Sequence, residues 1–93
     1  MTTDEIESFI GDEIASLTAV PRDSITADTP LIGGGRVLDS ADLVVLLLAI
    51  EDLARDRLGT TWDWTSDSAM SEARSVLRTV GSLAAHVGAL RQG

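Results

Sequence analysis

The sequence contains no cysteine, and all seven of its basic side chains are arginine, so it has no lysine either. Without cysteine the chain can form neither a disulfide framework nor a thiolate zinc site, and it has no protein thiol to act as a nucleophile. Without lysine it lacks the residue that forms Schiff bases and the residue that holds phosphates in a GxxxxGK[ST] loop. Any thiol that the protein uses must therefore belong to a group that is bound or attached to it.

Long apolar runs and net positive charge are missing as well. The longest apolar run, Leu43 to Ile50, is far shorter than the roughly 20 residues that span a bilayer. The start of the chain, Met1 to Glu5, is polar and acidic and lacks the features of a secretory signal. The formal charge of −8 repels nucleic-acid phosphates and anionic membranes. We expect a cytoplasmic monomer that binds neither nucleic acid nor membranes.

The length of 93 residues suits one hydrophobic core and is too short for two domains or a deep enclosed active site. We therefore expect a single domain over residues 1–93. Chain ends are usually the least ordered part of a domain, so its ordered core is predicted over about residues 3–90.

Helical periodicity begins near the start of the chain. A first helix is predicted from Thr3 to Ala19, with Asp4 and Glu5 in its first turn, where the helix dipole favours acids. Its apolar positions are Ile6, Phe9, Ile10, Ile14 and Leu17. Pro21 ends this helix because proline cannot donate the next hydrogen bond. The long loop that follows contains a few apolar residues, which we expect to pin it across a bundle: Ile25, Pro30, Leu31 and Ile32.

Two further helices are predicted. One runs from Ser40 to about Leu58, is free of glycine and proline, and opens with Asp39 and Ser40, two good capping residues. The next stretch is polar and less periodic, with one short helix expected over Asp67 to Glu72. Thr79 then caps a final helix, whose apolar face is Val80, Leu83, Ala84, Val87 and Leu90. The fold class is thus all-α: a small four-helix bundle of three principal helices and one short one.

The helix that starts at Ser40 has more apolar surface than one buried stripe requires. At about 100° per residue, one cluster should face the core: Leu43, Leu46, Leu47, Ile50 and Ala54. A second cluster lies nearly opposite: Ala41, Val45, Leu48 and Asp52. Flanked by the acids Asp42 and Glu51, it is interpreted as a docking surface for basic partner proteins. A homodimer interface and scattered surface apolar residues are the alternatives.

Ser40 lies where a loop enters this helix, so a phosphate on its hydroxyl would lie near the free amides and positive dipole end of the first turn. The sequence offers no group to activate it as a nucleophile, because the single histidine, His86, belongs to another helix and no G-x-S-x-G elbow surrounds the serine. Ser40 is therefore interpreted as an attachment point, with a plain helix cap as the alternative.

The motif Val37-Leu38-Asp39-Ser40-Ala41-Asp42-Leu43, followed by an apolar helix that ends in Glu51-Asp52, resembles the acyl and peptidyl carrier protein family. The first helix, the long loop and the opening of the last helix follow in the family's order, so the resemblance covers most of the chain. It implies an acyl-carrier-like bundle in which a phosphopantetheinyl transferase moves 4′-phosphopantetheine from coenzyme A onto Ser40. The terminal thiol of that arm would carry an acyl group, and the carrier itself would catalyse nothing.

The resemblance also implies roles for the neighbours of Ser40. Asp39 matches the residue that precedes the family's serine, and three acids match the family's partner-docking helix: Asp42, Glu51 and Asp52. Ala41 and Val45 depart from the family pattern, which puts the choice of partner enzymes in doubt. The implied partners are a loading ligase or transferase and condensing or tailoring enzymes. The long stretch before the last helix favours specialised, polyketide-like biosynthesis over fatty acid biosynthesis.

Three other functions remain open. The cargo of the arm would be aminoacyl if the chain were a stand-alone peptidyl carrier of nonribosomal peptide biosynthesis. An unmodified helical interaction subunit would use the Ser40 helix only as a binding surface. A small serine hydrolase is disfavoured by the missing elbow and base.

The remaining conspicuous residues have structural interpretations. Trp62 and Trp64 alternate, so one is expected to pack inward while the other stays partly exposed. The run Gly33 to Gly35 follows no strand and precedes no G-K-[ST] sequence, which favours loop flexibility over a phosphate site. His86 has no cluster of metal ligands around it in sequence.

Overall fold

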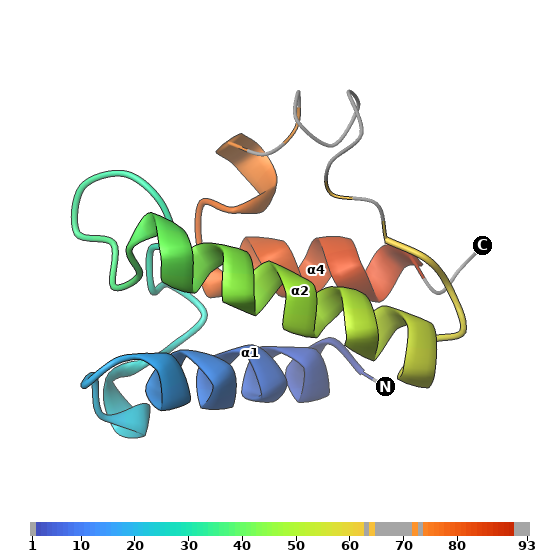
Figure 1. Cartoon of the computed structure of the whole chain (residues 1–93), viewed down its shortest axis with the longest axis horizontal. Coiled ribbons are helices and arrows are strands. Elements are labelled where there is room, and N and C mark those ends of the chain that lie inside the picture. The colour runs from blue at the N-terminus through green and yellow to red at the C-terminus, as the bar shows by residue number, and fades with distance from the viewer. Residues whose placement is uncertain (1, 63, 65–71, 73, 91–93) are drawn as a thin grey trace.

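Three long helices, each formed by one of the periodic segments, make the frame of the protein (Figure 1). The computed structural model describes residues 2–62, 64, 72 and 74–90, and these include α1 (Thr3–Leu17), α2 (Ser40–Arg57) and α4 (Val80–Leu90). Helix α1 packs against both α2 and α4 and runs in the opposite direction to each (Figure 1). These residues form no strand, only an isolated antiparallel bridge between Pro30 and Thr79. The predicted all-α helical bundle is confirmed.

Helix α1 begins as predicted and ends two residues early. Its N-cap is Thr2, which forms a reciprocal capping box with Glu5. At the other end Thr18 is already extended, and its hydroxyl donates a hydrogen bond of 2.8 Å to the carbonyl oxygen of Ile14. The amide of Thr18 donates to the same Ile14 carbonyl at 3.0 Å, and the extended backbone of Thr18 then leads the chain out of the helix. The predicted end at Ala19 is therefore wrong.

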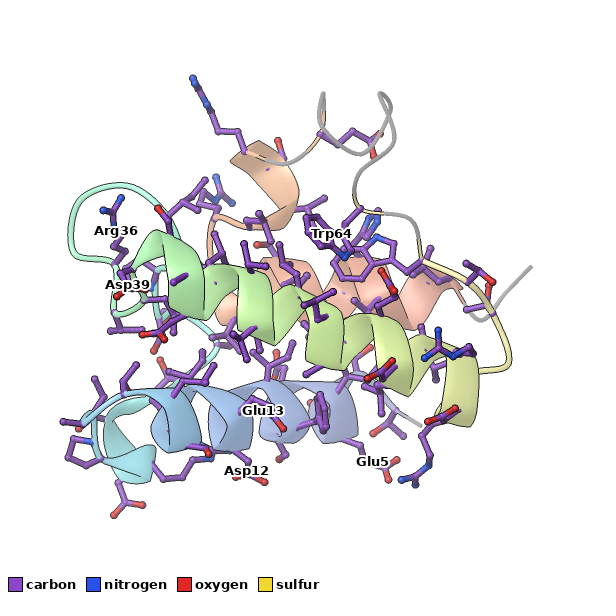
Figure 2. All side chains as sticks on the ribbon, in the orientation of Figure 1. Glu5, Asp12, Glu13, Arg36, Asp39 and Trp64 are labelled. Atoms are coloured by element: carbon purple, nitrogen blue, oxygen red, sulfur yellow. The ribbon has the colours of Figure 1, made fainter. Side chains whose placement is uncertain are left out.

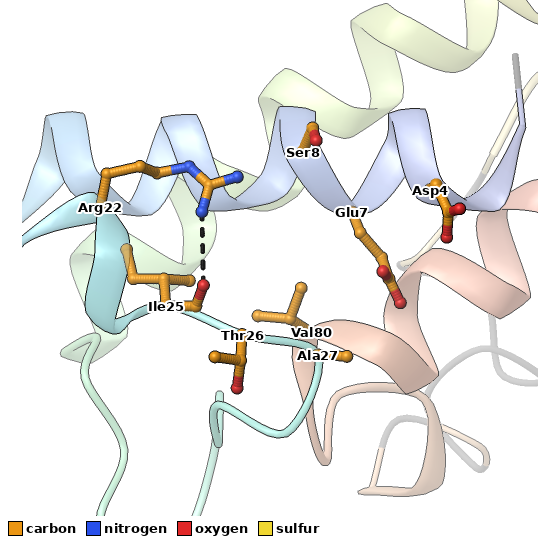
Figure 3. A pocket seen from close by; sticks show the side chains of 8 residues that line it. All are labelled: Asp4, Glu7, Ser8, Arg22, Ile25, Thr26, Ala27 and Val80. Carbon is orange, nitrogen blue, oxygen red and sulfur yellow. Dashed lines mark hydrogen bonds between the residues drawn. The ribbon is translucent and has the colours of Figure 1, made fainter.

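A short 3-10 helix, η1 (Arg22–Ser24), follows where the sequence predicts only a loop. Arg22 lies across α1, and its Nε donates to Asp12 Oδ1 at 2.8 Å. Its Nη1 donates to the carbonyl of Ile25 at 3.3 Å (Figure 3). Gly11 makes room for this guanidinium, because a Cβ at that position would lie 2.6 Å from Arg22 Cζ. Arg22 therefore fastens η1 to α1.

The loop between η1 and α2 is anchored on the start of α4. The amides of Val80 and Gly81 donate to the carbonyls of Thr29 and Ala27 at 3.0 and 2.8 Å. A Cβ at Gly81 would lie 3.0 Å from Ala27 O, a tight contact, so the close approach favours glycine. As predicted, apolar loop residues pin this loop: Ile25 and Leu31 are buried, and Pro30 and Ile32 are half-buried.

The first turn of α4 is capped as predicted. The amide of Ser82 donates to Thr79 Oγ1 at 3.1 Å, and the amide of Thr79 donates to Ser82 Oγ at 3.0 Å. Four of its five predicted apolar positions are fully buried, and Leu90 is half-buried. The predicted short helix over Asp67 to Glu72 lies outside the described residues except for Glu72, which is helical, as are residues 74–76.

One hydrophobic core joins the three long helices. All three contribute completely buried side chains, and the loop adds Leu31: Ile6, Ile10, Ile14, Leu31, Leu46, Ile50, Ala54, Leu83, Ala84 and Val87. Trp62 is buried and Trp64 half-buried, which confirms the predicted difference between the two tryptophans. In the described part of the chain, no helix has the length and apolar character needed to cross a membrane.

Candidate modification site and docking surface

Ser40 is the first residue of α2 and is exposed. The N-cap is Asp39, whose Oδ1 accepts a 2.8 Å hydrogen bond from the amide of Asp42. The amide of Leu43 donates to the carbonyl of Asp39 at 2.9 Å, which closes the first helical turn. Asp39 and Ser40 are both good capping residues by type, but only Asp39 caps the helix. The capping alternative for Ser40 is therefore wrong.

The first turn of α2 retains the donors that an anion would need. No described residue accepts a hydrogen bond from the amides of Ser40 or Ala41, and none forms a hydrogen bond with the Ser40 hydroxyl. Free amides at a helix N-terminus favour negative charge through their own N–H groups and through the helix dipole. A phosphoryl group on Ser40 Oγ would therefore lie in a favourable electrostatic environment.

The segment that leads into Ser40 combines a turn with an anchor. Gly33 and Gly35 both have a φ of 80°, a left-handed conformation that glycine adopts without strain. Leu38 is 2% exposed and ties the chain to the core two residues before Ser40. Arg36 and Asp39 flank the entry to the helix (Figure 2). Ser40 thus closely follows Leu38, which is fixed in the core, and the glycine turn lies farther upstream.

The exposed side of α2 next to Ser40 is apolar. Its large members are Val44, Val45 and Leu48, which are 44, 45 and 47% exposed. Together with the exposed Ala41 they form one helical face, here called the apolar strip. Val44 is not among the residues predicted to be exposed, because an uninterrupted apolar run contains no polar residue that marks where the buried face ends. The exposure predicted for Ala41, Val45 and Leu48 is confirmed.

The buried side of α2 differs slightly from the predicted stripe. Leu46, Leu47, Ile50 and Ala54 are buried as predicted, together with Leu53, which the prediction omitted. Leu43 is half-buried and packs against the edge of the core, so it lies on the predicted side of the helix. The helix ends at Arg57, with Leu58 as its C-cap.

The acids expected to flank the docking surface are not equivalent. Asp42 and Glu51 are half-buried, whereas Asp52 is exposed. The Asp52 carboxylate forms an ion pair with Arg55 of the same helix, so part of its charge is balanced locally. Close to Ser40, α2 therefore offers a partner more apolar surface than unpaired negative charge.

A separate hollow lies between α1, the loop after η1 and the start of α4 (Figure 3). Its polar side chains include Asp4, Glu7, Ser8 and Arg22. Arg22 is already engaged by Asp12 and the carbonyl of Ile25. This hollow holds a structural contact, and no side chain of the Ser40 motif lines it.

His86 has a packing contact. Its ring lies against Trp62, with ring centroids 6.1 Å apart and planes tilted by 56°. Within the described residues, no group of three histidine, aspartate or glutamate side chains could hold a metal ion. The indole Nε1 of the half-buried Trp64 is shielded from solvent, and none of the residues that the structure describes forms a hydrogen bond with it.

Comparison with known proteins adds no family to this site. The scan of protein-family models, the search of curated proteins and the search of solved structures each found no match.

Proposed function

We propose that this protein is an acyl carrier protein that holds its cargo as a thioester on a 4′-phosphopantetheine arm attached to Ser40. The observation that carries the proposal is that Asp39 and Ser40 have different roles at the start of α2. Asp39 supplies the cap, so the exposed Ser40 has no capping role. A serine that is needed only for capping would occupy the position of Asp39.

In the proposed reaction Ser40 supplies only the hydroxyl group that is modified. The hydroxyl oxygen attacks the β-phosphorus of coenzyme A in the transferase active site, the bond to the nucleotide phosphate breaks, and the hydroxyl proton passes to a base of the transferase. The new phosphodiester on Ser40 has one negative charge, beside the free first-turn amides. The carrier gains a flexible arm whose thiol raises the effective concentration of its cargo at partner enzymes.

The apolar strip supports the second half of the proposal, which is docking. Loading enzymes and condensing or tailoring enzymes would contact Ala41, Val45 and Leu48, with Asp42, Glu51 and Asp52 at the edge. Exposed apolar side chains of this size beside a modification site are a common mark of protein contacts. We include Val44 in this surface because it is exposed on the same face.

Intact-mass spectrometry after incubation with coenzyme A, magnesium and a promiscuous phosphopantetheinyl transferase tests the proposal. Wild type and a Ser16→Ala control, which changes an exposed serine in α1, should each gain one phosphopantetheine group. Ser40→Ala should gain none. If folded wild type gains nothing while a known carrier is loaded in parallel, the carrier proposal is wrong and an unmodified interaction subunit is favoured.

The docking half has its own measurement, the rate of loading by the same transferase. Leu48→Gln should slow loading, because it places an amide in the apolar strip. Ala85→Gln, a change on the exposed side of α4, is the matched control and should leave the rate unchanged. Equal rates for the two variants would show that the transferase does not use the strip.

A further inference from the structure

The negative charge of the protein is concentrated on α1. This helix carries five carboxylates and no basic residue: Asp4, Glu5, Glu7, Asp12 and Glu13. Helix α2 carries four carboxylates and two arginines, and α4 carries none of either. The formal charge of −8 is therefore far from evenly distributed. A positively charged partner would be steered first toward α1.

An aromatic ring lies within this acidic surface. Phe9 is half-buried at the edge of the core, one helical turn from Glu5 on one side and from Asp12 and Glu13 on the other. The three acids lie along α1 in Figure 2. Phe9 also has apolar contacts with the core, which hold the ring in place and leave part of it accessible to solvent.

Two shallow hollows meet at Phe9. One lies between α1 and α2, has a volume of about 370 Å³ and is lined by Phe9, Ala49, Asp52, Leu53, Asp56 and Arg57. The other lies on α1 and is lined by Asp4, Glu5, Ser8, Phe9 and Asp12. We call the two hollows together the Phe9 groove. It borders the C-terminal half of α2, whereas the apolar strip occupies the N-terminal half.

The groove keeps negative charge after ion pairs and its one lining arginine are counted. Asp12 is paired with Arg22, and Asp52 is paired with Arg55. Asp4, Glu5 and Asp56 form no ion pair with the side chains that the structure describes, and the one arginine that lines the groove, Arg57, offsets only one of these three charges. The groove thus combines an accessible ring with a carboxylate available to a partner.

We propose that the Phe9 groove binds an arginine side chain on a basic segment of a partner protein. A guanidinium group stacks on aromatic faces and also forms paired hydrogen bonds with carboxylates, so one residue type satisfies both features of the groove. A second copy of this chain is a poor occupant because two molecules of charge −8 repel each other. The groove does not include Ser40, so this proposal holds whether or not the serine is modified.

Titration of the ¹⁵N-labelled protein with a hexa-arginine peptide tests the proposal at fixed, low ionic strength. The largest amide shift changes should fall at Phe9, Asp56 and their neighbours. Phe9→Leu keeps an apolar side chain and removes the ring, and should weaken binding roughly two- to fivefold. Asp56→Asn should weaken binding by a similar factor, roughly two- to fivefold.

Matched controls separate a groove from a general attraction between opposite charges. Asp23→Asn in η1 removes the same charge from an exposed position outside the groove and should weaken binding less than Asp56→Asn. Hexalysine, which carries the same charge without a planar guanidinium, should bind more weakly than hexa-arginine. Amide spectra of each variant before titration report whether its fold is intact.

Three results would overturn the proposal. The first is equal weakening by Asp56→Asn and Asp23→Asn, which would show dependence on net charge alone. The second is evidence against stacking of a guanidinium on the ring, either as equal affinity for hexalysine and hexa-arginine or as unchanged binding in Phe9→Leu. The third is a set of shift changes centred on Val44, Val45 and Leu48, which would place basic segments on the apolar strip. None of these results depends on phosphopantetheine loading, so failure here and failure of the carrier proposal are distinguishable.

Discussion

Helices α1 and α2 pack into the same core, yet they present opposite kinds of surface to solvent. Helix α1 has isoleucines at Ile6, Ile10 and Ile14 on its buried side and carboxylates on much of the rest. Helix α2 buries a similar stripe but exposes more apolar surface, at Val44 and Leu48 among others. The difference is one of surface chemistry: α1 presents mainly carboxylates to solvent, whereas α2 presents exposed apolar side chains near Ser40.

The distinction matters for how a partner would approach. Electrostatic attraction acts over about 10 Å at moderate ionic strength, whereas apolar contact acts only when surfaces touch. In the proposed carrier, the charge on α1 would orient a basic partner before the apolar strip contacts it beside Ser40.

The largest effect should separate the two faces of α2. Leu46 is completely buried and Leu48 is 47% exposed, so the two leucines form a matched pair only two residues apart. Leu46→Ala should lower the free energy of unfolding by about 2–5 kcal/mol, through lost burial and the cavity that remains. Leu48→Ala should change it by less than about 1 kcal/mol. Urea denaturation of both variants makes the comparison, and equal losses would mean that the apolar strip belongs to the core.

The next largest effect concerns the start of α2. Asp39→Ala should lower the unfolding free energy by about 1 kcal/mol, because the amide of Asp42 loses its acceptor. Asp39→Asn keeps a good capping oxygen and should retain most of the stability. The same denaturation measurement serves both variants. A stable Asp39→Ala protein would show that the cap is dispensable, which would weaken the contrast between Asp39 and Ser40.

A smaller effect tests whether the acids of α1 repel one another. Added sodium chloride should raise the melting temperature of wild type, because salt screens the like charges. The paired change Glu7→Gln and Glu13→Gln should reduce this rise more than Asp42→Asn with Glu51→Gln in α2. Each like-charge contact is worth only about 0.2–0.5 kcal/mol. A melting temperature that does not respond to salt would argue against charge crowding on either helix.

The smallest effect lies at the start of α1. The backbone amide of Thr2, followed by its hydroxyl, lowers the pKa of the Glu5 carboxyl below its ordinary value. Because the folded-state pKa is the lower one, the stabilisation is present above the unfolded pKa and is lost as the pH falls through the folded pKa. An NMR titration should therefore show the Glu5 carboxyl protonating at a lower pH in the folded protein than in the urea-unfolded chain. In Thr2→Ala, which retains the backbone amide, the pKa of Glu5 should rise partway toward its ordinary value.

Much of the fold could be predicted because its signals are local. The isoleucines of α1, the aspartate before α2 and the threonine before α4 mark helix faces and helix starts directly in the sequence. The prediction lost accuracy where local signals compete or are absent. The extended backbone of Thr18 ended α1 two residues early, and the continuous apolar run of α2 contains no polar residue that would mark Val44 as exposed.

The candidate site was only partly predictable for a related reason. Ser40 and the exposure of Val45 and Leu48 follow from one motif and one helical wheel. Contacts between segments distant in sequence have no such signature. The ion pair that ties Arg22 to Asp12 is of this kind, and so is the position of Phe9 beside α2.

The contact between α1 and α4 has a consequence for the time course of protein synthesis. A Cβ at Gly88 would lie 3.2 Å from Thr3 Oγ1, so the last turns of α4 cover the first turns of α1. On the ribosome, the isoleucines of α1 emerge first and remain without that cover until almost the whole described chain has been made. The final fold is therefore expected to assemble late, after release of α4 from the exit tunnel, and the nascent α1 must stay soluble until then. The many carboxylates of α1 should oppose aggregation during this time, because highly charged segments resist association with one another.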